Sequence, residues 1–238
     1  MRKKPLFVQL LAAAIICLYG GLGLPDRLHA AERVAQTNRW GSAIAAFEAA
    51  DKTNPPPQNA ILFIGSSSIR IWPDLQQSFP GHKVFKRGFG GSELSDSVAF
   101  ADRIVTPYKP AIILLYAGDN DIANGRSPEQ ILSAYKAFVQ KVRAALPDGY
   151  IGYIAIKPCP ARGKLLNEVK TTNRLIREYA VSDKKLLFID VFTPMLDPNG
   201  RLRPELFGKG GLHLNEKGYA LWASIIQPVL DQYDARKP

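Results

Sequence analysis

The chain has 238 residues, of which 46% are hydrophobic and 22% are charged, values that are ordinary for a globular protein. One main domain is the expectation at this length, with enough residues to bury a proper core. The formal net charge is +10 at pH 7, but the basic residues are dispersed, without the basic stripe and interleaved aromatic residues of a nucleic-acid site. We therefore expect no nucleic-acid partner.

The N-terminus is typical of an export signal. Three basic residues at positions 2–4 precede an apolar run over residues 6–24, and LHA at 28–30 has the spacing of a signal-peptidase site. We expect residues 1–30 to be a cleaved signal peptide, and the mature protein to be periplasmic or secreted without a stable membrane span. The alternative is an uncleaved N-terminal membrane anchor, although a glutamine and three glycines weaken the run as a bilayer span.

Few residues of the mature chain are suited to binding a metal ion. Cleavage would remove Cys17 and leave Cys159 alone, so we expect no internal disulfide. One cysteine and two histidines would remain, too few for a Cys/His metal site. We expect a structural role for Cys159 and neither a metal nor another cofactor.

Residues 31–58 are predicted to be an N-terminal helical arm followed by a proline-rich linker. Trp40, Ile44 and Phe47 fall on one helical face, and the sequence NPPPQN then ends the helix. The main domain is expected over residues 59–238.

Apolar runs alternate with helical patterns through the main domain. Ser127, Pro128 and Gln130 form a good helix start, and Asn215 is suited to cap the last helix. The alternation predicts a parallel sheet with helices on both faces, in which chemistry collects at the carboxyl ends of the strands. The strands are expected at 60–65, 83–86, 111–118, 150–156 and 185–191, and the helices near 93–105, 128–145, 164–182 and 215–234.

Polar residues follow several of these strands. Three serines at 66–68 follow the first strand and are placed either to supply a nucleophile or to cap a helix. The glycines in RGFGGS at 87–92 favour backbone N–H groups that face an anion, and the amide of Asn120 can donate to an oxyanion. His213 precedes the last helix and is the one plausible imidazole base, since His29 leaves with the signal and we expect His82 at the surface of the opposite edge.

These blocks, in this order, resemble the SGNH (GDSL-like) esterase and lipase hydrolases, over about residues 59–235. The resemblance is greatest to members related to platelet-activating-factor acetylhydrolase-like esterases. GSSS at 65–68 aligns Ser67 with the catalytic serine, while RGFGGS and GDND align Gly91 and Asn120 with the oxyanion glycine and asparagine. GLHLNEKGY aligns His213 with the catalytic base. The fold implied is α/β: a three-layer, flavodoxin-like α/β/α sandwich around a five-stranded parallel sheet of order 2-1-3-4-5.

The resemblance implies a serine esterase that hydrolyses carboxylic acyl esters through a Ser–His acyl-enzyme mechanism, and the N-terminal signal adds the expectation that this esterase is exported. The family usually carries Asp three residues before the histidine, whereas this chain has Gly210. Three explanations are open: a backbone carbonyl near Lys209 or Gly210 orients the ring, a carboxylate from Glu205 or Asp190 substitutes, or the protein is a weak or inactive binder of acylated glycan or lipid.

Arg162, in the segment KPCPAR after the fourth strand, either lines the mouth of the substrate site or pairs with a surface acid. Trp72 and Trp222 are expected in the core rather than in an acyl pocket. The expected partner is a small-molecule, lipid or glycan acyl ester. The sequence specifies neither the acyl length, nor the alcohol, nor the oligomeric state.

Overall fold

The computed structural model describes the backbone of residues 24–234 and the side chains of residues 39–233. The chain divides into two compact units, Met1–Arg39 and Trp40–Pro238. The signal peptide predicted at residues 1–30 lies outside the residues whose side chains are described. In the first unit the described element is the beginning of helix α1 (Leu24–Thr53).

A five-stranded parallel sheet forms the centre of the second unit. Its order, β2-β1-β3-β4-β5, is the predicted one. Gly65 at the end of β1 pairs with Gly88 of β2 and with Tyr116 of β3, so the carboxyl ends of three neighbouring strands lie at one level. The strands are β1 (Ile61–Gly65), β2 (Val84–Gly88), β3 (Ile112–Tyr116), β4 (Tyr150–Ile154) and β5 (Leu186–Ile189).

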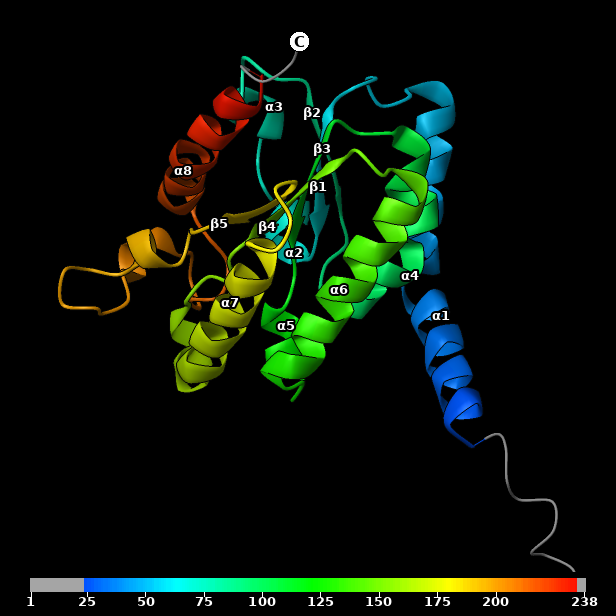
Figure 1. The fold of residues 1–238 in the computed structure, drawn as a ribbon. Helices are drawn as coiled ribbons and strands as arrows, with labels where there is room; N and C mark the ends of the chain where they lie inside the picture. The colour runs from blue at the N-terminus through cyan, green and yellow to red at the C-terminus, as the bar shows by residue number, and fades with distance from the viewer. Residues whose placement is uncertain (1–23, 235–238) are drawn as a thin grey trace, which may run out of the picture. The chain divides into compact units, whose positions relative to one another are not determined.

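Helices cover both faces of the sheet (Figure 1). One face packs against α4 (Leu94–Ile104), α6 (Pro128–Ala145), α7 (Leu166–Ala180) and residues 40–53 of α1. The other face packs against α2 (Ser67–Arg70), α3 (Leu75–Ser78) and α8 (Glu216–Asp234). The short elements are α5 (Asp119–Ala123) and the 3₁₀ turns η1 (Thr106–Tyr108), η2 (Pro160–Leu165), η3 (Thr193–Met195) and η4 (Pro204–Leu206).

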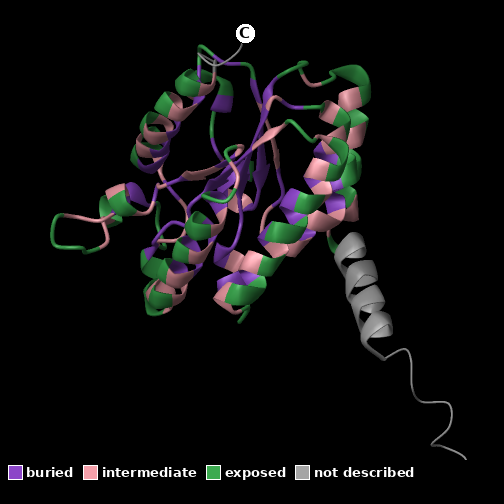
Figure 2. Ribbon diagram, viewed as in Figure 1, coloured by how far each residue is buried: buried purple, intermediate pink, exposed green. Residues whose placement is uncertain are grey.

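The apolar strand sequences predict burial on both faces, and β1 and β3 are buried along their whole length. Figure 2 shows the strands mainly in the colour of buried residues, between helices whose outer faces are exposed. Trp72 and Trp222 are fully buried, as predicted. The two helix starts are confirmed as well: Ser127 and Gln130 form a capping box, and Asn215 accepts a hydrogen bond from the Gly218 N–H.

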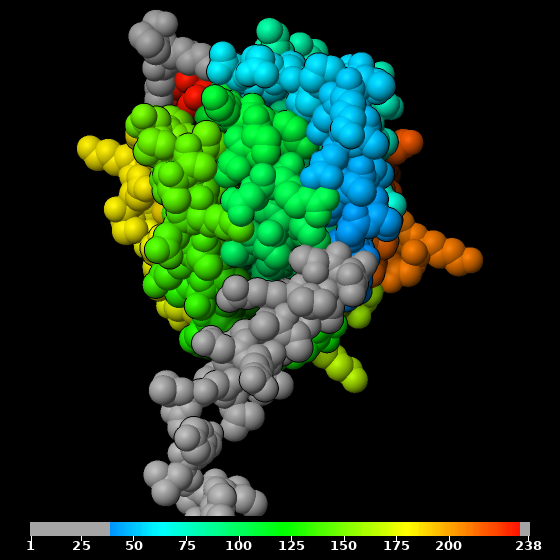
Figure 3. Space-filling view, turned by 90° about the vertical axis from the view of Figure 1, so that its right-hand side faces the viewer, coloured from blue at the N-terminus to red at the C-terminus, as the bar shows by residue number. Residues whose placement is uncertain are grey.

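The expected N-terminal arm is divided by the boundary between the two units. From Trp40 onward the helix belongs to the same compact unit as the sheet. Ile44 is fully buried, and Glu48 accepts two hydrogen bonds of 2.7 Å from Arg103 of α4. Figure 3 shows residues 40–53 in blue beside the green surface of α4 and α6.

His82 differs from the prediction of a surface residue, because it is buried. Its Nε2 atom lies 3.0 Å from the carboxylate of Asp231 and 3.1 Å from the amide of Gln227. Both partners belong to α8, and this helix covers His82 at the edge of the sheet where the sequence predicted an exposed residue.

Across the described residues, no helix has both the length and the apolar content needed to cross a membrane.

Candidate active site

Ser67 is the first residue of α2, directly beyond the end of β1. Gly65 makes this turn possible: its φ is +140°, and a Cβ there would lie 1.8 Å from the carbonyl oxygen of Tyr116. The Ser66 N–H donates to that same carbonyl at 3.0 Å. The chain therefore leaves the sheet close against β3, and Ser67 stands at the carboxyl edge of the sheet.

His213 meets Ser67 from the loop that precedes α8. Its Nε2 atom lies 3.1 Å from the Ser67 Oγ, although the two residues are 146 positions apart in the sequence. The loop is anchored on both sides, because Gly208 N–H donates to the His213 carbonyl at 2.9 Å and Ala161 N–H donates to the Gly211 carbonyl at 3.2 Å. The backbone thus holds the imidazole beside the serine.

Gly91 and Asn120, the two predicted oxyanion residues, line the same cleft as Ser67 and His213. Asn120 lies in the first turn of α5, two residues beyond Gly118. Its amide Nδ2 donates to the Ser92 carbonyl at 3.0 Å. A side-chain amide has two N–H groups, so the second remains available for an oxyanion.

Arg162 is bonded to the oxyanion residue. Its guanidinium donates to the side-chain oxygen of Asn120 at 2.9 Å and to the main-chain carbonyl of Asp119 at 2.6 Å. Arg162 was expected either to line the mouth of the substrate site or to pair with a surface acid. The structure is nearer to the second role, but the acid beside Arg162 is the buried Asp119, 3.5 Å away, and not a surface residue. Because guanidinium is purely a donor, this contact fixes which end of the Asn120 amide faces Arg162.

A buried ion pair lies behind these residues. The ammonium of Lys157 is 1% exposed, and it donates at 2.9 Å to both the Asp119 carboxylate and the Tyr116 hydroxyl. Burial by itself raises the pKa of Asp119, but Lys157, Arg162 and the Tyr116 hydroxyl together hold that pKa below its ordinary value. The Asp119 carboxylate therefore stays charged and fixes Lys157 at the carboxyl end of β4.

The pKa of His213 is lowered from its ordinary value of 6.5. Burial is the largest cause, and Lys157, Arg70 and Arg162 act in the same direction, while Asp119 opposes them. A lowered pKa keeps the imidazole neutral at pH 7, as a general base requires.

Neither predicted acid candidate is bonded to His213. The Asp190 carboxylate accepts hydrogen bonds from Arg177 at 2.7 Å and from Thr193 at 2.8 Å. The Glu205 carboxylate accepts one from Arg203 at 2.9 Å. Within residues 39–233, the hydrogen bond made by the His213 ring is the one with Ser67, so no carboxylate or backbone carbonyl of that range holds the other ring nitrogen. Gly210 has φ +96° and open space where a Cβ would stand.

The cleft over the Ser67–His213 pair has a volume of about 690 Å³. One wall comes from α1, with the side chains of Trp40, Ala43, Ala46 and Phe47. Phe89 continues this apolar surface and contacts Trp40 edge to face, with ring centroids 5.7 Å apart. The space is of the size that accommodates a small or medium organic substrate.

The described residues contain no group of three or more His, Cys, Asp or Glu side chains placed to hold a metal ion. Cys159 is buried without a disulfide partner, and burial raises the pKa of its thiol. A thiol with a raised pKa forms little thiolate at neutral pH, so Cys159 is poorly suited to act as a nucleophile.

Sequence reasoning missed Lys157, Asp119 and Arg70 as members of the site. Lys157 follows the apolar run YIGYIAI, and a lysine at the carboxyl end of a buried strand was the available signal. Arg70 lies three residues after Ser67 on the same short helix. The α1 wall had no comparable signal, because its helical pattern reveals an apolar face but not the cleft which that face lines.

A five-stranded sheet of this order, with a serine and a histidine meeting at its carboxyl edge, has the α/β fold of the SGNH hydrolases. The model of the GDSL-like Lipase/Acylhydrolase family matches residues 64–221, a range that contains Ser67, Gly91, Asn120 and His213. The chain belongs to this family of hydrolases. No curated protein matches it significantly in sequence.

Solved structures share the fold at low sequence identity. A protein named as a platelet activating factor, from Streptococcus pneumonia, has a TM-score of 0.70 and 22% identity, covering 88% of this chain and all of its own. A GDSL-like lipase from Bacteroides thetaiotaomicron has a TM-score of 0.65 and 18% identity, with coverage of 82% and 97%. A carbohydrate esterase of family 3 from Talaromyces cellulolyticus has a TM-score of 0.53 and 17% identity, with coverage of 74% and 99%.

Proposed function

We propose that this protein is a serine esterase that hydrolyses carboxylic acyl esters through a Ser67–His213 pair. The observation that carries the proposal is the 3.1 Å contact between the Ser67 Oγ and the His213 Nε2, in a cleft that Gly91 and Asn120 also line. Family membership supports the reaction class, because the matching model describes lipases and acylhydrolases.

The proposed reaction has two stages. His213 removes the hydroxyl proton of Ser67 as its oxygen attacks the ester carbonyl, and the imidazolium then gives that proton to the departing alcohol. The backbone N–H groups of Ser67 and Gly91 and the amide of Asn120 stabilise the oxyanion. Each such donor typically contributes about 3–4 kcal/mol to the stabilisation of the transition state. Water, activated by His213, then hydrolyses the acyl-enzyme.

The proposed mechanism is that of a dyad, since no carboxylate of the described range bonds to His213. An orienting acid can be worth about 10⁴-fold in rate in a complete triad. Here the anchored loop around His213 takes over part of the orienting task. It supplies no negative charge to stabilise the imidazolium, so we expect a slow enzyme.

The test is hydrolysis of p-nitrophenyl acetate and p-nitrophenyl butyrate by the purified mature chain, with Ser67→Ala as control. We expect activity in the parent and its loss in Ser67→Ala. Parent activity that persists in Ser67→Ala would overturn the assignment of the nucleophile.

A second candidate function is a binder of acylated glycan or lipid with little or no turnover. The observation that favours it is Gly210, which replaces the usual acid of the family. This candidate predicts measurable affinity of the parent for an acyl ester that it leaves intact over hours, and rapid turnover of that ester would contradict it.

We also propose that the chain is exported, because a basic start, an apolar run over residues 6–24 and LHA at 28–30 fit a cleaved signal. Mass measurement of the protein from a bacterial periplasmic fraction tests this. A mature N-terminus at residue 31 is the expected result, and a full-length, membrane-bound chain would favour the anchor.

A further inference from the structure

Arg70 lines the catalytic cleft with a guanidinium that has no partner among the residues whose side chains the structure describes. It is one of the residues that line the cleft, together with Ser67 and His213. Its side chain is exposed and lies against Gly90, where a Cβ would be 2.7 Å from the arginine Nε. Within residues 39–233 the Arg70 side chain makes no hydrogen bond or ion pair, whereas Arg87 and Arg103 pair with Asp51 and Glu48.

Among residues 39–233, the lining of the cleft contains no carboxylate that could neutralise Arg70. The buried Asp119 behind the cleft is already paired with Lys157 and lies 3.5 Å from Arg162. Gly210 stands where a family member would usually have one more negative charge. The field over the Ser67–His213 pair is therefore positive, and such a cleft attracts anions.

The wall of the cleft that α1 forms is apolar and firmly held. Trp40 and Phe47 of α1 line the cleft, while the same helix is tied to the sheet through the Asp51–Arg87 ion pair. The hydroxyl of Tyr108 reinforces that pair by donating to Asp51 at 2.6 Å. The same cleft thus offers an apolar surface for an acyl chain and a cation for an anionic group.

We propose that Arg70 is a subsite for an anionic group of the substrate, so that the preferred substrates are acyl esters bearing a carboxylate, phosphate or sulfate near the ester bond. Arginine suits this role because its planar fork binds such oxyanions through two parallel hydrogen bonds. The inference rests on the proposed esterase function and adds a substrate class to it. The anion can belong to the acyl part or to the alcohol part of the ester.

Two pairs of esters test the subsite and separate these two sources. In the alcohol pair, 3-(4-acetoxyphenyl)propionate is compared with its methyl ester, and in the acyl pair, mono(4-nitrophenyl) glutarate is compared with its methyl ester. The quantity measured is the ratio of kcat/KM for the anionic ester to that for the neutral ester. Because both esters meet the same protein sample, a loss of folded protein cancels in the ratio.

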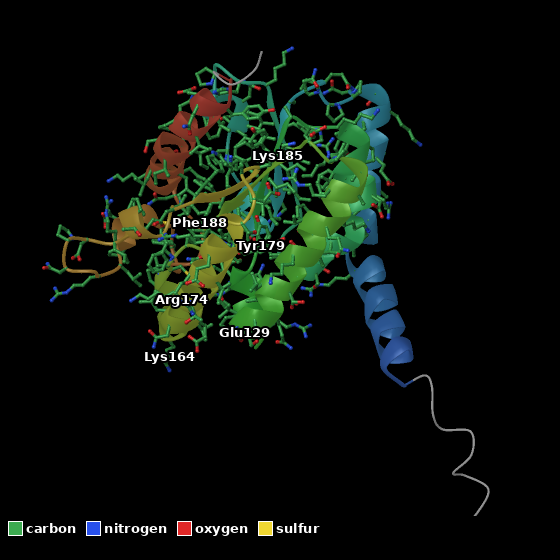
Figure 4. The ribbon with its side chains drawn as sticks, viewed as in Figure 1. Glu129, Lys164, Arg174, Tyr179, Lys185 and Phe188 are labelled. Atoms are coloured by element: carbon green, nitrogen blue, oxygen red, sulfur yellow. The ribbon has the colours of Figure 1, made fainter. Side chains whose placement is uncertain are left out.

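We expect a ratio above one in the parent for at least one pair, and the pair that shows it identifies the side of the ester on which the anion lies. Arg70→Gln should lower that ratio about tenfold, as expected for a hydrogen-bonded charge pair. Arg70→Lys should keep part of the preference, and Arg70→Glu should reverse it. Arg174 of α7, labelled in Figure 4, is a matched control, because it is exposed and paired with Glu178. Arg174→Gln removes the same net charge and should leave both ratios unchanged.

Ratios that do not respond to Arg70→Gln in either pair would overturn the subsite, while Ser67-dependent turnover of the neutral esters would leave the esterase function intact. If the parent hydrolyses none of the four esters, the esterase function fails, and the subsite is then decided by titration calorimetry of the same esters. Tighter binding of the anionic ester that weakens about tenfold in Arg70→Gln would sustain the subsite, and equal affinities would overturn it.

Discussion

The guanidinium of Arg162 donates to the side-chain oxygen of Asn120 at 2.9 Å, and so leaves the Asn120 nitrogen to serve as donor. The same guanidinium donates to the main-chain carbonyl of Asp119, so that side chain and backbone of the α5 start are held together. Arg162 is therefore a positioning residue: it acts on the reaction through the amide that faces the oxyanion.

We expect Arg162→Lys to lower kcat by roughly tenfold or more, since one donor lost from an oxyanion hole costs 10²- to 10³-fold and a misplaced donor costs part of that. Lysine keeps the charge but lacks the fork that reaches both acceptors. The measurement is a double-mutant cycle with Asn120→Ala. If Arg162 acts through Asn120, Arg162→Lys should have little further effect in the Asn120→Ala background. Two effects that add fully would show an independent role, such as contact with the substrate.

The acid limb of the pH–rate profile should lie below pH 6.5. His213 must be neutral to act as base, and burial together with nearby cations lowers its pKa, so activity should persist to a lower pH than an ordinary histidine would allow. Because the Arg70 charge contributes to this lowering, Arg70→Gln should move the limb to higher pH, measured as kcat/KM for a neutral ester. A limb above pH 6.5 in the parent would instead indicate a carboxylate that stabilises the imidazolium.

Gly210→Asp tests the missing acid, provided that it is compared with Gly210→Ala. Both substitutions place a Cβ at φ +96°, where side chains are strained, and both meet open space, so they share the backbone cost. A rate for Asp that exceeds the rate for Ala by tenfold or more would show that a carboxylate here still reaches His213. Equal rates would show that the loop no longer directs position 210 toward the ring.

Asp121 should make the protein less stable as the pH rises toward neutrality. Burial raises its pKa from 3.8 to about 7, so the folded state binds this proton more tightly than the unfolded state. Stability from this group is therefore lost between about pH 4 and pH 7, by at most about 4 kcal/mol. Asp121→Asn keeps an oxygen for the Leu94 N–H, which Asp121 accepts at 2.9 Å, but does not titrate.

The difference in Tm between Asp121→Asn and the parent should therefore become more positive from pH 4.5 to pH 8. Other titrating groups are common to both proteins and cancel in the difference. A difference that is the same at both pH values would contradict the raised pKa.

The sequence predicted the fold well because its signals are local. The five strands are short apolar runs, and Ser127 and Asn215 cap their helices as those residue types do elsewhere. The contact between Ser67 and His213 also followed from local signals, since carboxyl ends of parallel strands share one edge.

What the sequence could not show depends on contacts between distant segments. Arg162 reaches Asn120 across 42 positions, and Lys157 reaches Asp119 across 38. His82 was misplaced for the same reason, because its cover comes from α8 near the other end of the chain. Such pairs join residues that share no spacing or motif, so predicting helices and strands from the sequence does not reveal these contacts.

The compact unit begins with a helical segment that lines the cleft, and this matters for the design of a shortened chain. The lining residues of this segment are Trp40, Ala43, Ala46 and Phe47. A chain begun at residue 59, where the proline-rich segment suggests a border, would lose one wall of its cleft and the acid that pairs with Arg87. Trp40 would no longer shield Phe89, and the space left by Ile44 would open apolar core surface to water. Such a shortened protein would tend to aggregate, and any activity it kept would report the chemistry of Ser67 without the selectivity of the intact molecule.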